Sequence, residues 1–158
     1  MLKSPGGGGG GGGGGGLAAS SASVHNSGVI SIANNTFVAP AWDTKDFDTL
    51  GTYWSAGTPD RFTIPVTGQY LVTGAAAFAA NATGNRIVGF FKNLSTAILY
   101  GGSTAPTSSG TNQSALCATY IYSLSAGDTV QFAVFQSSGA GLNMAGNFVS
   151  FFAICRVG

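Results

Sequence analysis

The sequence contains no glutamate, and charged residues of every kind are scarce. Among 158 residues, six are Lys or Arg and five are Asp, so the formal net charge is only +1. The cations stand singly along the chain and form no basic stripe, which disfavours a nucleic-acid partner. A surface so poor in charge is poorly soluble as a monomer. We therefore expect partner subunits to cover part of the apolar surface.

Side chains for catalysis or metal binding are equally sparse. The chain has one histidine, His25, and no glutamate to complete a carboxylate pair. Its only acidic cluster is Asp43, Asp46 and Asp48. Carboxylates bind calcium, but this spacing does not match an EF-hand loop, and a solvated turn is the preferred interpretation. We predict a protein that is not an enzyme and uses no metal or cofactor.

Strong helix formers are nearly absent, whereas Gly, Ala, Ser and Thr dominate beside many Phe and Val. This composition favours strands and turns. No stretch approaches the ~20 apolar residues of a membrane span, so no membrane partner is expected. Residues 1–5 run directly into glycine and lack the apolar core of a secretory signal. The expectation is a protein made in a cytoplasm and not exported by the secretory route.

Two cysteines are present, Cys117 and Cys155. Each lies in an apolar, strand-like run, and two buried free thiols are the preferred interpretation. A disulfide between neighbouring strands is the alternative. The spacing of the cysteines and the single histidine matches no zinc site.

An unbroken run of eleven glycines extends from Gly6 to Gly16. One interpretation is a floppy tether, because glycine loses the most conformational entropy on ordering. The other is an extended arm held between neighbours, because glycine permits close backbone approach. We assign residues 1–27 to an anchoring arm and residues 28–158 to one folded domain. The expected anchoring residues are Leu2, Lys3, Pro5, Gly6, Gly16 and Leu17.

From residue 28 onward, short apolar runs alternate with turn residues, which is typical of a β-sandwich or barrel. Residues 40–59 are expected to be rich in turns, with Trp42, Phe47, Tyr53 and Trp54 as apolar contacts. The expected strands cover residues 29–32, 36–39, 61–65, 69–79, 85–92, 96–100, 114–124, 129–136 and 147–157.

The last of these strands is apolar on both faces. Phe148, Phe152 and Ile154 alternate with a second apolar set that includes Val149 and Phe151. Residues 87–91 repeat the pattern. An antiparallel sheet usually exposes one face to water, and no helix is available to cover the second. The preferred explanation is that one face lies in the core and the other against a sister subunit; the alternative is one thick domain that buries both.

Two blocks resemble the complement 1q globular-head and tumour necrosis factor superfamily. Phe62, Gly68 and Tyr70 match its pattern of an aromatic, five residues, Gly, any residue and Tyr. Residues 124–130 match its Leu-x-x-Gly-Asp-x-Val block. Residues 92–93 fall at a family hairpin, and residues 150–152 fit its closing strand. The resemblance spans residues 28–158.

The chain also departs from the family pattern. Val72 and Gly74 replace aromatics, Leu94 replaces a hairpin Gly, and Ala153 stands where Gly is common. These departures argue against a close animal complement relative. Residues 47–51 together with Arg86 look more like the versions found in bacteriophage structural proteins.

The resemblance implies an all-β, antiparallel, ten-stranded jelly-roll sandwich packed as a tight homotrimer. The Pro65–Gly68 turn, a buried Tyr70 with a bonded hydroxyl, and a Gly127–Asp128 hairpin turn agree with it. The residues expected in the trimer interface or core are Tyr70, Phe90, Tyr120, Tyr122, Phe132, Phe148, Phe151 and Phe152.

Together with the arm and the missing signal, the resemblance predicts a virion structural protein of a tailed bacteriophage. The specific expectation is a trimeric capsid decoration or head-fibre protein, anchored by its arm to the major capsid protein or other virion proteins. The alternative is the receptor- or carbohydrate-binding head of a tail fibre, with a host-surface glycan as its ligand. The candidate contact loops for that role are residues 80–85, 101–111 and 137–146.

Overall fold

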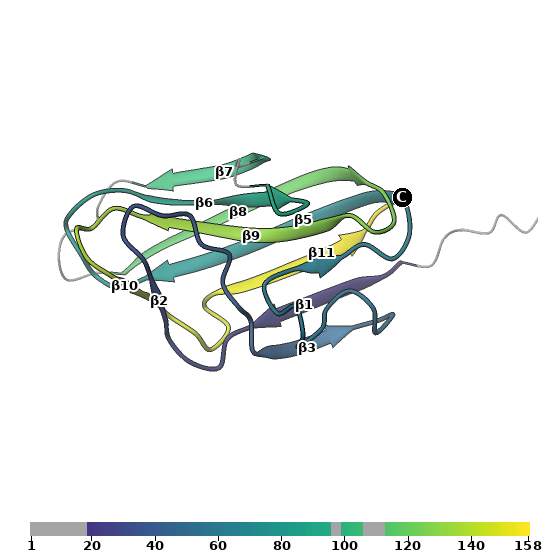
Figure 1. The fold of residues 1–158 in the computed structure, drawn as a ribbon, viewed down its shortest axis with the longest axis horizontal. Helices are drawn as coiled ribbons and strands as arrows, with labels where there is room; N and C mark the ends of the chain where they lie inside the picture. Colours follow the sequence, from purple (N-terminus) through teal and green to yellow (C-terminus); the bar gives the residue numbers. More distant parts are fainter. Residues whose placement is uncertain (1–18, 96–98, 106–112) are drawn as a thin grey trace, which may run out of the picture.

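The computed structural model describes residues 19–95, 99–105 and 113–158, which form two antiparallel β-sheets packed face to face (Figure 1). The larger sheet has the order β2-β10-β5-β11-β1-β3, and β8 pairs with the other edge of β5. Its strands are β1 (Ser21–His25), β2 (Ile30–Ile32), β3 (Thr44–Asp48), β5 (Gly68–Phe78), β8 (Ser114–Leu124), β10 (Leu142–Met144) and β11 (Phe151–Arg156). The smaller sheet has the order β4-β9-β6-β7, with β4 (Phe62–Thr63), β6 (Arg86–Lys92), β7 (Leu99–Ala105) and β9 (Thr129–Gln136).

The predicted all-β sandwich is confirmed, with eleven strands in the described residues where ten were expected. The bounds of β8 and β9 match the predicted runs. In both strands apolar residues recur with the two-residue period that places one set in the core. No helix among the described residues could cross a membrane.

Three strands were not predicted. β1 lies inside the segment assigned to the arm, and it pairs with β11 on one side and β3 on the other. The folded domain therefore begins before residue 28. β3 lies in the region expected to be rich in turns, and β10 lies in a predicted contact loop. β7 also runs to Ala105, so residues 101–105 are strand and not loop.

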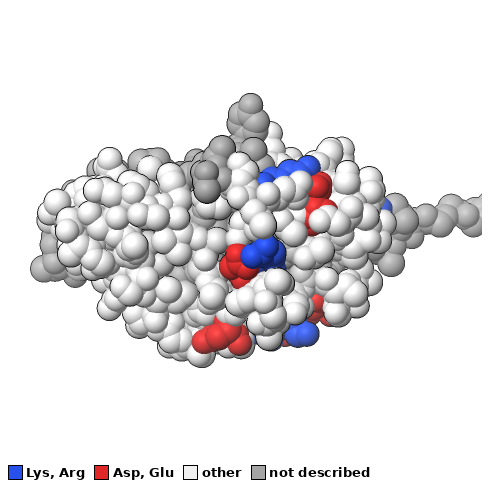
Figure 2. Space-filling view, in the orientation of Figure 1, with Lys and Arg blue, Asp and Glu red and all other residues white. Residues whose placement is uncertain are grey.

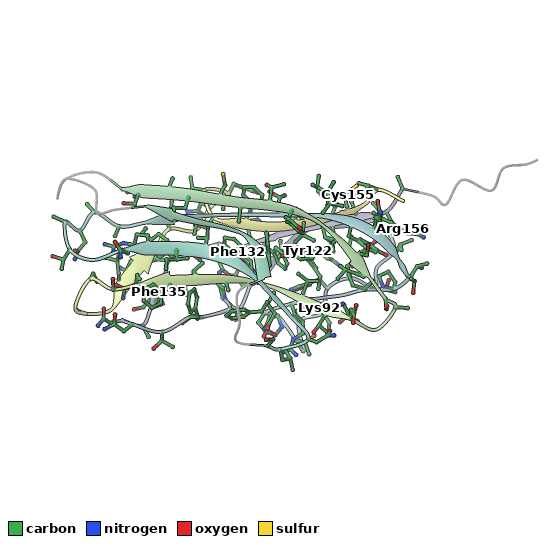
Figure 3. All side chains as sticks on the ribbon, turned by 90° about the horizontal axis from the view of Figure 1, so that it is seen from above. Lys92, Tyr122, Phe132, Phe135, Cys155 and Arg156 are labelled. Atoms are coloured by element: carbon green, nitrogen blue, oxygen red, sulfur yellow. The ribbon has the colours of Figure 1, made fainter. Side chains whose placement is uncertain are left out.

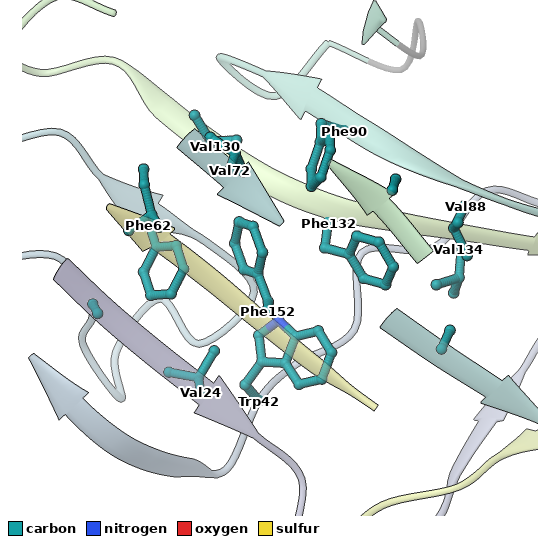
Figure 4. Close-up of a cluster of buried hydrophobic side chains, with 14 of the residues drawn as sticks. Val24, Trp42, Phe62, Val72, Val88, Phe90, Val130, Phe132, Val134 and Phe152 are labelled. Carbon is teal, nitrogen blue, oxygen red and sulfur yellow. The ribbon is translucent and has the colours of Figure 1, made fainter. Parts of the chain in front are cut away.

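Aromatic side chains fill the space between the sheets (Figure 4). Phe62 and Phe152 stack at 4.3 Å between ring centroids, and Trp42, Phe90 and Phe132 surround them. Figure 3 views the two layers edge-on, with Phe132 between them. The fold therefore centres on aromatic rings, each of which removes a large apolar area from water.

The outer face of the smaller sheet is partly covered by the chain itself. Val38 bridges to Val134 along β9, and the ring of Phe37 packs on Phe135 at 4.9 Å and on Phe91 at 6.0 Å between centroids. Phe91 is thereby only 5% exposed. At Phe91 the prediction of a sister subunit on the second face was wrong, because Phe37 of the same chain packs there.

The molecule has two distinct ends (Figure 1). Residue 19 and the C-terminus lie at one end, which we call the proximal end. At the opposite end the sheets are joined by residues 33–36, 79–85 and 137–141, which we call the distal loops. The arm residues Leu2, Lys3, Pro5, Gly6, Gly16 and Leu17 lie outside the described residues.

Candidate oligomerisation face and distal loops

The larger sheet presents an outer face that nothing in the described chain covers. Within β5, β8 and β11 this outer face consists of Gln69, Leu71, Thr73, Ala75, Ala115, Cys117, Thr119, Ile121, Ser123, Phe151, Ala153 and Cys155. None of these residues is charged. Ile121 is 55% exposed and lies opposite Leu71 in the ladder. Across β5, β8 and β11 the outer face is thus neutral and built mainly from small or apolar side chains.

The residues expected at the trimer interface or core divide into three groups. Tyr70, Phe90, Phe132 and Phe152 are completely buried within one subunit and belong to its core. The Tyr70 hydroxyl donates to the Val66 carbonyl, as the buried ring requires. Phe151 lies half-buried on the outer face. The other three, Tyr120, Tyr122 and Phe148, lie at the margins of the sandwich.

Tyr120 and Tyr122 lie in β8, the strand of the larger sheet beyond β5. Both point toward the smaller sheet, and their rings lie 4.7 Å apart. Tyr122 packs edge-on against Phe90 at 6.2 Å, whereas Tyr120 remains 39% exposed. Burial, with a contribution from Tyr120, raises the pKa of Tyr122 to about 12. β8 therefore presents aromatic surface beside the neutral outer face.

Strand alternation predicted that Phe148 would lie on the same face as the buried Phe152, but Phe148 is exposed. Asn147 and Phe148 both adopt left-handed backbone conformations, with φ of 56° and 67°, so the chain bends before β11. The ring is 68% exposed and lies 4.0 Å from the imidazole of His25. Sequence alternation could not reveal this bend, because it assumes extended backbone throughout residues 147–157.

The acidic cluster is satisfied by the chain's own donors. Asp46 accepts from His25 Nδ1 at 2.6 Å and from the Ser23 hydroxyl at 2.7 Å. Asp43 accepts from the backbone and hydroxyl of Ser27, and these bonds lower its pKa. Asp48 accepts four backbone N–H groups of residues 50–54. Within the described ranges, no group of three or more His, Cys, Asp or Glu is placed to hold a metal ion.

The two cysteines are free thiols, as preferred, but neither of them is buried. Cys117 lies opposite Ala75 and Cys155 opposite Leu71, on the two sides of β5. Cys117 is exposed and Cys155 half-exposed, both on the outer face. The alternation of residues 114–124 carried this signal, because it places Cys117 opposite in phase to Leu116 and Leu124.

Two fully buried polar side chains support the distal loops. Arg86 and Gln136 are direct cross-strand partners, and both have no exposed surface. The Arg86 guanidinium donates to the carbonyls of Asn81, Thr83 and Asn85 at 3.0 to 3.2 Å. Burial lowers the pKa of Arg86.

Gln136 fixes the neighbouring loop in the same way. Its side-chain nitrogen donates to the carbonyls of Ile32 and Ala140 at 3.0 and 2.7 Å, and its oxygen accepts from the Ser138 N–H. In the sequence, Arg86 is marked only by a family resemblance, and no signal marks Gln136. Nothing in the local pattern distinguishes a buried glutamine from an exposed one.

Of the predicted contact loops, residues 80–85 and the start of 137–146 do meet. Ser137 N–H donates to the Asn85 carbonyl at 3.1 Å, and Asn85 N–H donates to the Ser137 hydroxyl at 2.8 Å. A Cβ on Gly84 would lie 1.8 Å from the Ser137 carbonyl oxygen, so the two loops pack backbone to backbone. Residues 106–111 of the third predicted loop lie outside the described residues.

Solved structures of tumour necrosis factor ligands have the same architecture. Over 89% of this chain, the fold matches all (100%) of murine APRIL at pH 5.0 with a TM-score of 0.66 and 13% identity, and at pH 8.0 with 0.64 and 13%. It matches 92% of Eiger TNF from S. frugiperda, over 89% of this chain, with a TM-score of 0.62 and 12% identity. No protein-family model and no curated protein matches the sequence. The chain has the antiparallel β-jelly-roll fold of tumour necrosis factor-like proteins.

Proposed function

We propose that this chain is a homotrimeric, non-enzymatic structural protein of a tailed bacteriophage virion, a capsid decoration or head-fibre protein. Its N-terminal arm attaches it to the major capsid protein or another virion protein. The observation that carries the proposal is the uncovered outer face of the larger sheet.

The outer face supports association between copies for two reasons. It contains no charge, so its burial removes apolar area from water without the desolvation of ions. It also adjoins Tyr120 in β8, whose 39%-exposed side chain offers aromatic surface to a neighbour. A neutral face and an aromatic margin on one subunit can make head-to-tail contacts between copies, which form a ring where the rotation closes. The family resemblance described above implies that this ring has three members.

The polarity of the molecule supports attachment by the arm. Residue 19 lies at the proximal end, because the Arg156 N–H donates to the Ser20 carbonyl beside the C-terminus. The distal loops lie at the other end, away from the point where the arm begins. In a particle, arm attachment would therefore direct the distal loops outward. The phage assignment itself rests on the sequence resemblance of residues 47–51 and Arg86.

Removal of residues 1–18 tests the proposal. Because β1 is retained, the shortened protein should fold and associate like the full chain, yet fail to bind phage particles that lack this protein. Binding is measured by co-sedimentation with such particles, with the full chain as the positive control. Undiminished binding of the shortened protein would contradict the anchoring role.

The second candidate function is the receptor- or carbohydrate-binding head of a tail fibre. It is favoured by the contact between residues 80–85 and 137–141 at the end remote from the arm. Imaging of intact particles separates the two candidates, because one places the protein on the shell and the other at a fibre tip.

A further inference from the structure

The distal end carries no exposed charge among the described residues. In Figure 2 every blue or red side chain lies toward the centre or the proximal end of the visible face. The distal loops contain only uncharged residues, and Arg86, the one cation beside them, is fully buried. A ligand with a net charge would find no opposite charge here.

These loops are fixed in shape at a considerable energetic cost. Arg86 has no carboxylate partner among its described contacts, and its Nε has no hydrogen-bond partner. A buried charge satisfied only by carbonyls is expensive. Proteins retain unpaired buried charges of this kind mainly at functional sites, where the stability cost is offset elsewhere. Arg86 and Gln136 thus act as supporting residues that preorganise the loops, which lowers the entropy lost on binding.

A shallow groove of about 190 Å³ lies beside these loops, at the distal limit of the outer face. It is lined by Val29, Ala79, Gln113, Asn143 and Ala145. Backbone hydrogen bonds hold the lining residues together. The Ala79 N–H donates to the Asn143 carbonyl and the Ala145 N–H donates to the Ala77 carbonyl, both at 2.8 Å. The groove is smaller than the roughly 300–1,000 Å³ of pockets for drug-sized ligands, so it suits a single small ring.

The lining combines two kinds of surface. Gln113 and Asn143 are exposed, and their side-chain amides make no hydrogen bond within the described structure. Each amide offers both donors and an acceptor, which match the paired hydroxyls of a sugar ring. Val29, 64% exposed, and the two alanines supply an apolar surface for the C–H groups of such a ring.

From this lining and the neutral surroundings, we infer that the groove binds a terminal residue of an uncharged saccharide. The amides of Gln113 and Asn143 bind its hydroxyls, and Val29, Ala79 and Ala145 contact its apolar face. This binding role does not depend on where the chain sits in a particle. Each groove binds weakly, and several copies in one assembly raise the avidity.

The full chain is tested on an array of neutral saccharides with hexose or N-acetylhexosamine ends, beside sialylated and sulfated ones. Binding to at least one neutral saccharide is expected, with no gain from added acid groups. The double variant Gln113→Ala, Asn143→Ala should weaken that binding about tenfold or more, because two hydrogen-bonding groups are lost. The matched control Asn85→Ala removes an exposed amide of the same end that does not line the groove, and should bind normally.

Three results would overturn the inference: no neutral saccharide bound at millimolar concentration, binding confined to acidic saccharides, or equal binding by the double variant. Light scattering on the same samples reports the oligomeric state. A failure of saccharide binding with an intact trimer is therefore distinguishable from a failure of the proposed assembly.

Discussion

Gly74 lies directly against the ring of Phe132 in the sandwich core. A Cβ at this position would come within 2.5 Å of Phe132 Cδ2, whereas real Cβ contacts are longer. This explains why the sequence departs here from the aromatic residue expected in the superfamily. The ring of Phe132 already occupies the space that a side chain at residue 74 would need.

Gly74→Ala should therefore destabilise the protein by about 1–3 kcal/mol through overpacking. The free energy of unfolding is measured by urea denaturation. Gly57→Ala is the control, since its nearest neighbour is the Ser55 hydroxyl at 3.5 Å, and it should change stability by less than about 0.5 kcal/mol. Equal free energies of unfolding for the two variants would show that Phe132 shifts to accommodate the added methyl group without loss of stability.

Asp128 joins two turns at the proximal end. Its carboxylate forms an ion pair with Lys92 Nζ at 2.7 Å and accepts from Asn93 Nδ2 and the Ser125 N–H, both at 2.8 Å. Burial by itself raises the pKa of Asp128, but these three partners outweigh it and hold the pKa below the ordinary value. A depressed pKa means that the charged form stabilises the fold, and that this contribution is lost as pH falls through the folded-state value.

Asp128→Asn should accordingly cost about 1 kcal/mol at neutral pH. The difference from the parent protein should begin to shrink below about pH 4, where the carboxylate of the unfolded chain takes up a proton, and should vanish as the pH falls through the depressed folded-state pKa. Urea unfolding at several pH values measures the difference. A gap that stays constant into acid would mean that the charge of Asp128 contributes nothing to stability.

At the scale of elements, β1 joins the edge strand β3 to β11 and the rest of the larger sheet. Its five residues pair with β11 and with β3, so it is an interior strand and not part of the arm. Val24 and Ala22 are at most 1% exposed and contribute to the core. Without β1, β11 would have a bare edge and β3 would lose the one partner strand it has among the described residues.

Deletion of residues 1–26 should therefore abolish cooperative folding or cause aggregation, because unpaired strand edges associate. Deletion of residues 1–18 is the control and should leave the melting temperature unchanged. Both are compared with the full chain by circular dichroism during heating. If the protein lacking residues 1–26 melts within a few degrees of the control, β1 is not required for folding.

At the scale of the whole molecule, apolar surface is distributed unevenly. The side chain of Phe37 covers Phe91 and Phe135 on the smaller sheet, whereas no described segment covers the outer face of the larger sheet across β5, β8 and β11. The outer face of the smaller sheet is thus partly buried within the subunit, and that of the larger sheet is left uncovered by the described residues. This asymmetry is the physical basis for proposing that copies of the chain associate through the larger sheet.

The full chain should be trimeric at micromolar concentration, and Ile121→Asp should shift it to the monomer. A carboxylate in a buried, neutral interface would lack any partner and would cost several kcal/mol. Multi-angle light scattering measures the mass. Leu50→Asp is the matched control, because Leu50 is 47% exposed and lies outside the outer face. A monomeric parent, or a trimeric Ile121→Asp variant, would contradict the proposed assembly.

The sequence by itself determined the fold class. Its two-residue alternation and turn residues predicted the bounds of β8 and β9, and the blocks around Tyr70 and Gly127 predicted the tumour necrosis factor-like architecture that the structural comparisons support. These signals are local: each depends on neighbouring residues that form a turn or share one face of a strand.

Only the tertiary structure decided which faces and loops come together. β1 is a short run of small and polar residues whose strand conformation is set by pairing with β11, more than a hundred residues away in sequence. The cover of Phe37 over Phe91, the outward turn of Phe148 and the pairing of Arg86 with Gln136 also depend on distant segments. Local patterns carry the periodicity of a strand but not the identity of its partners, so these contacts, and the candidate sites built from them, required the folded chain.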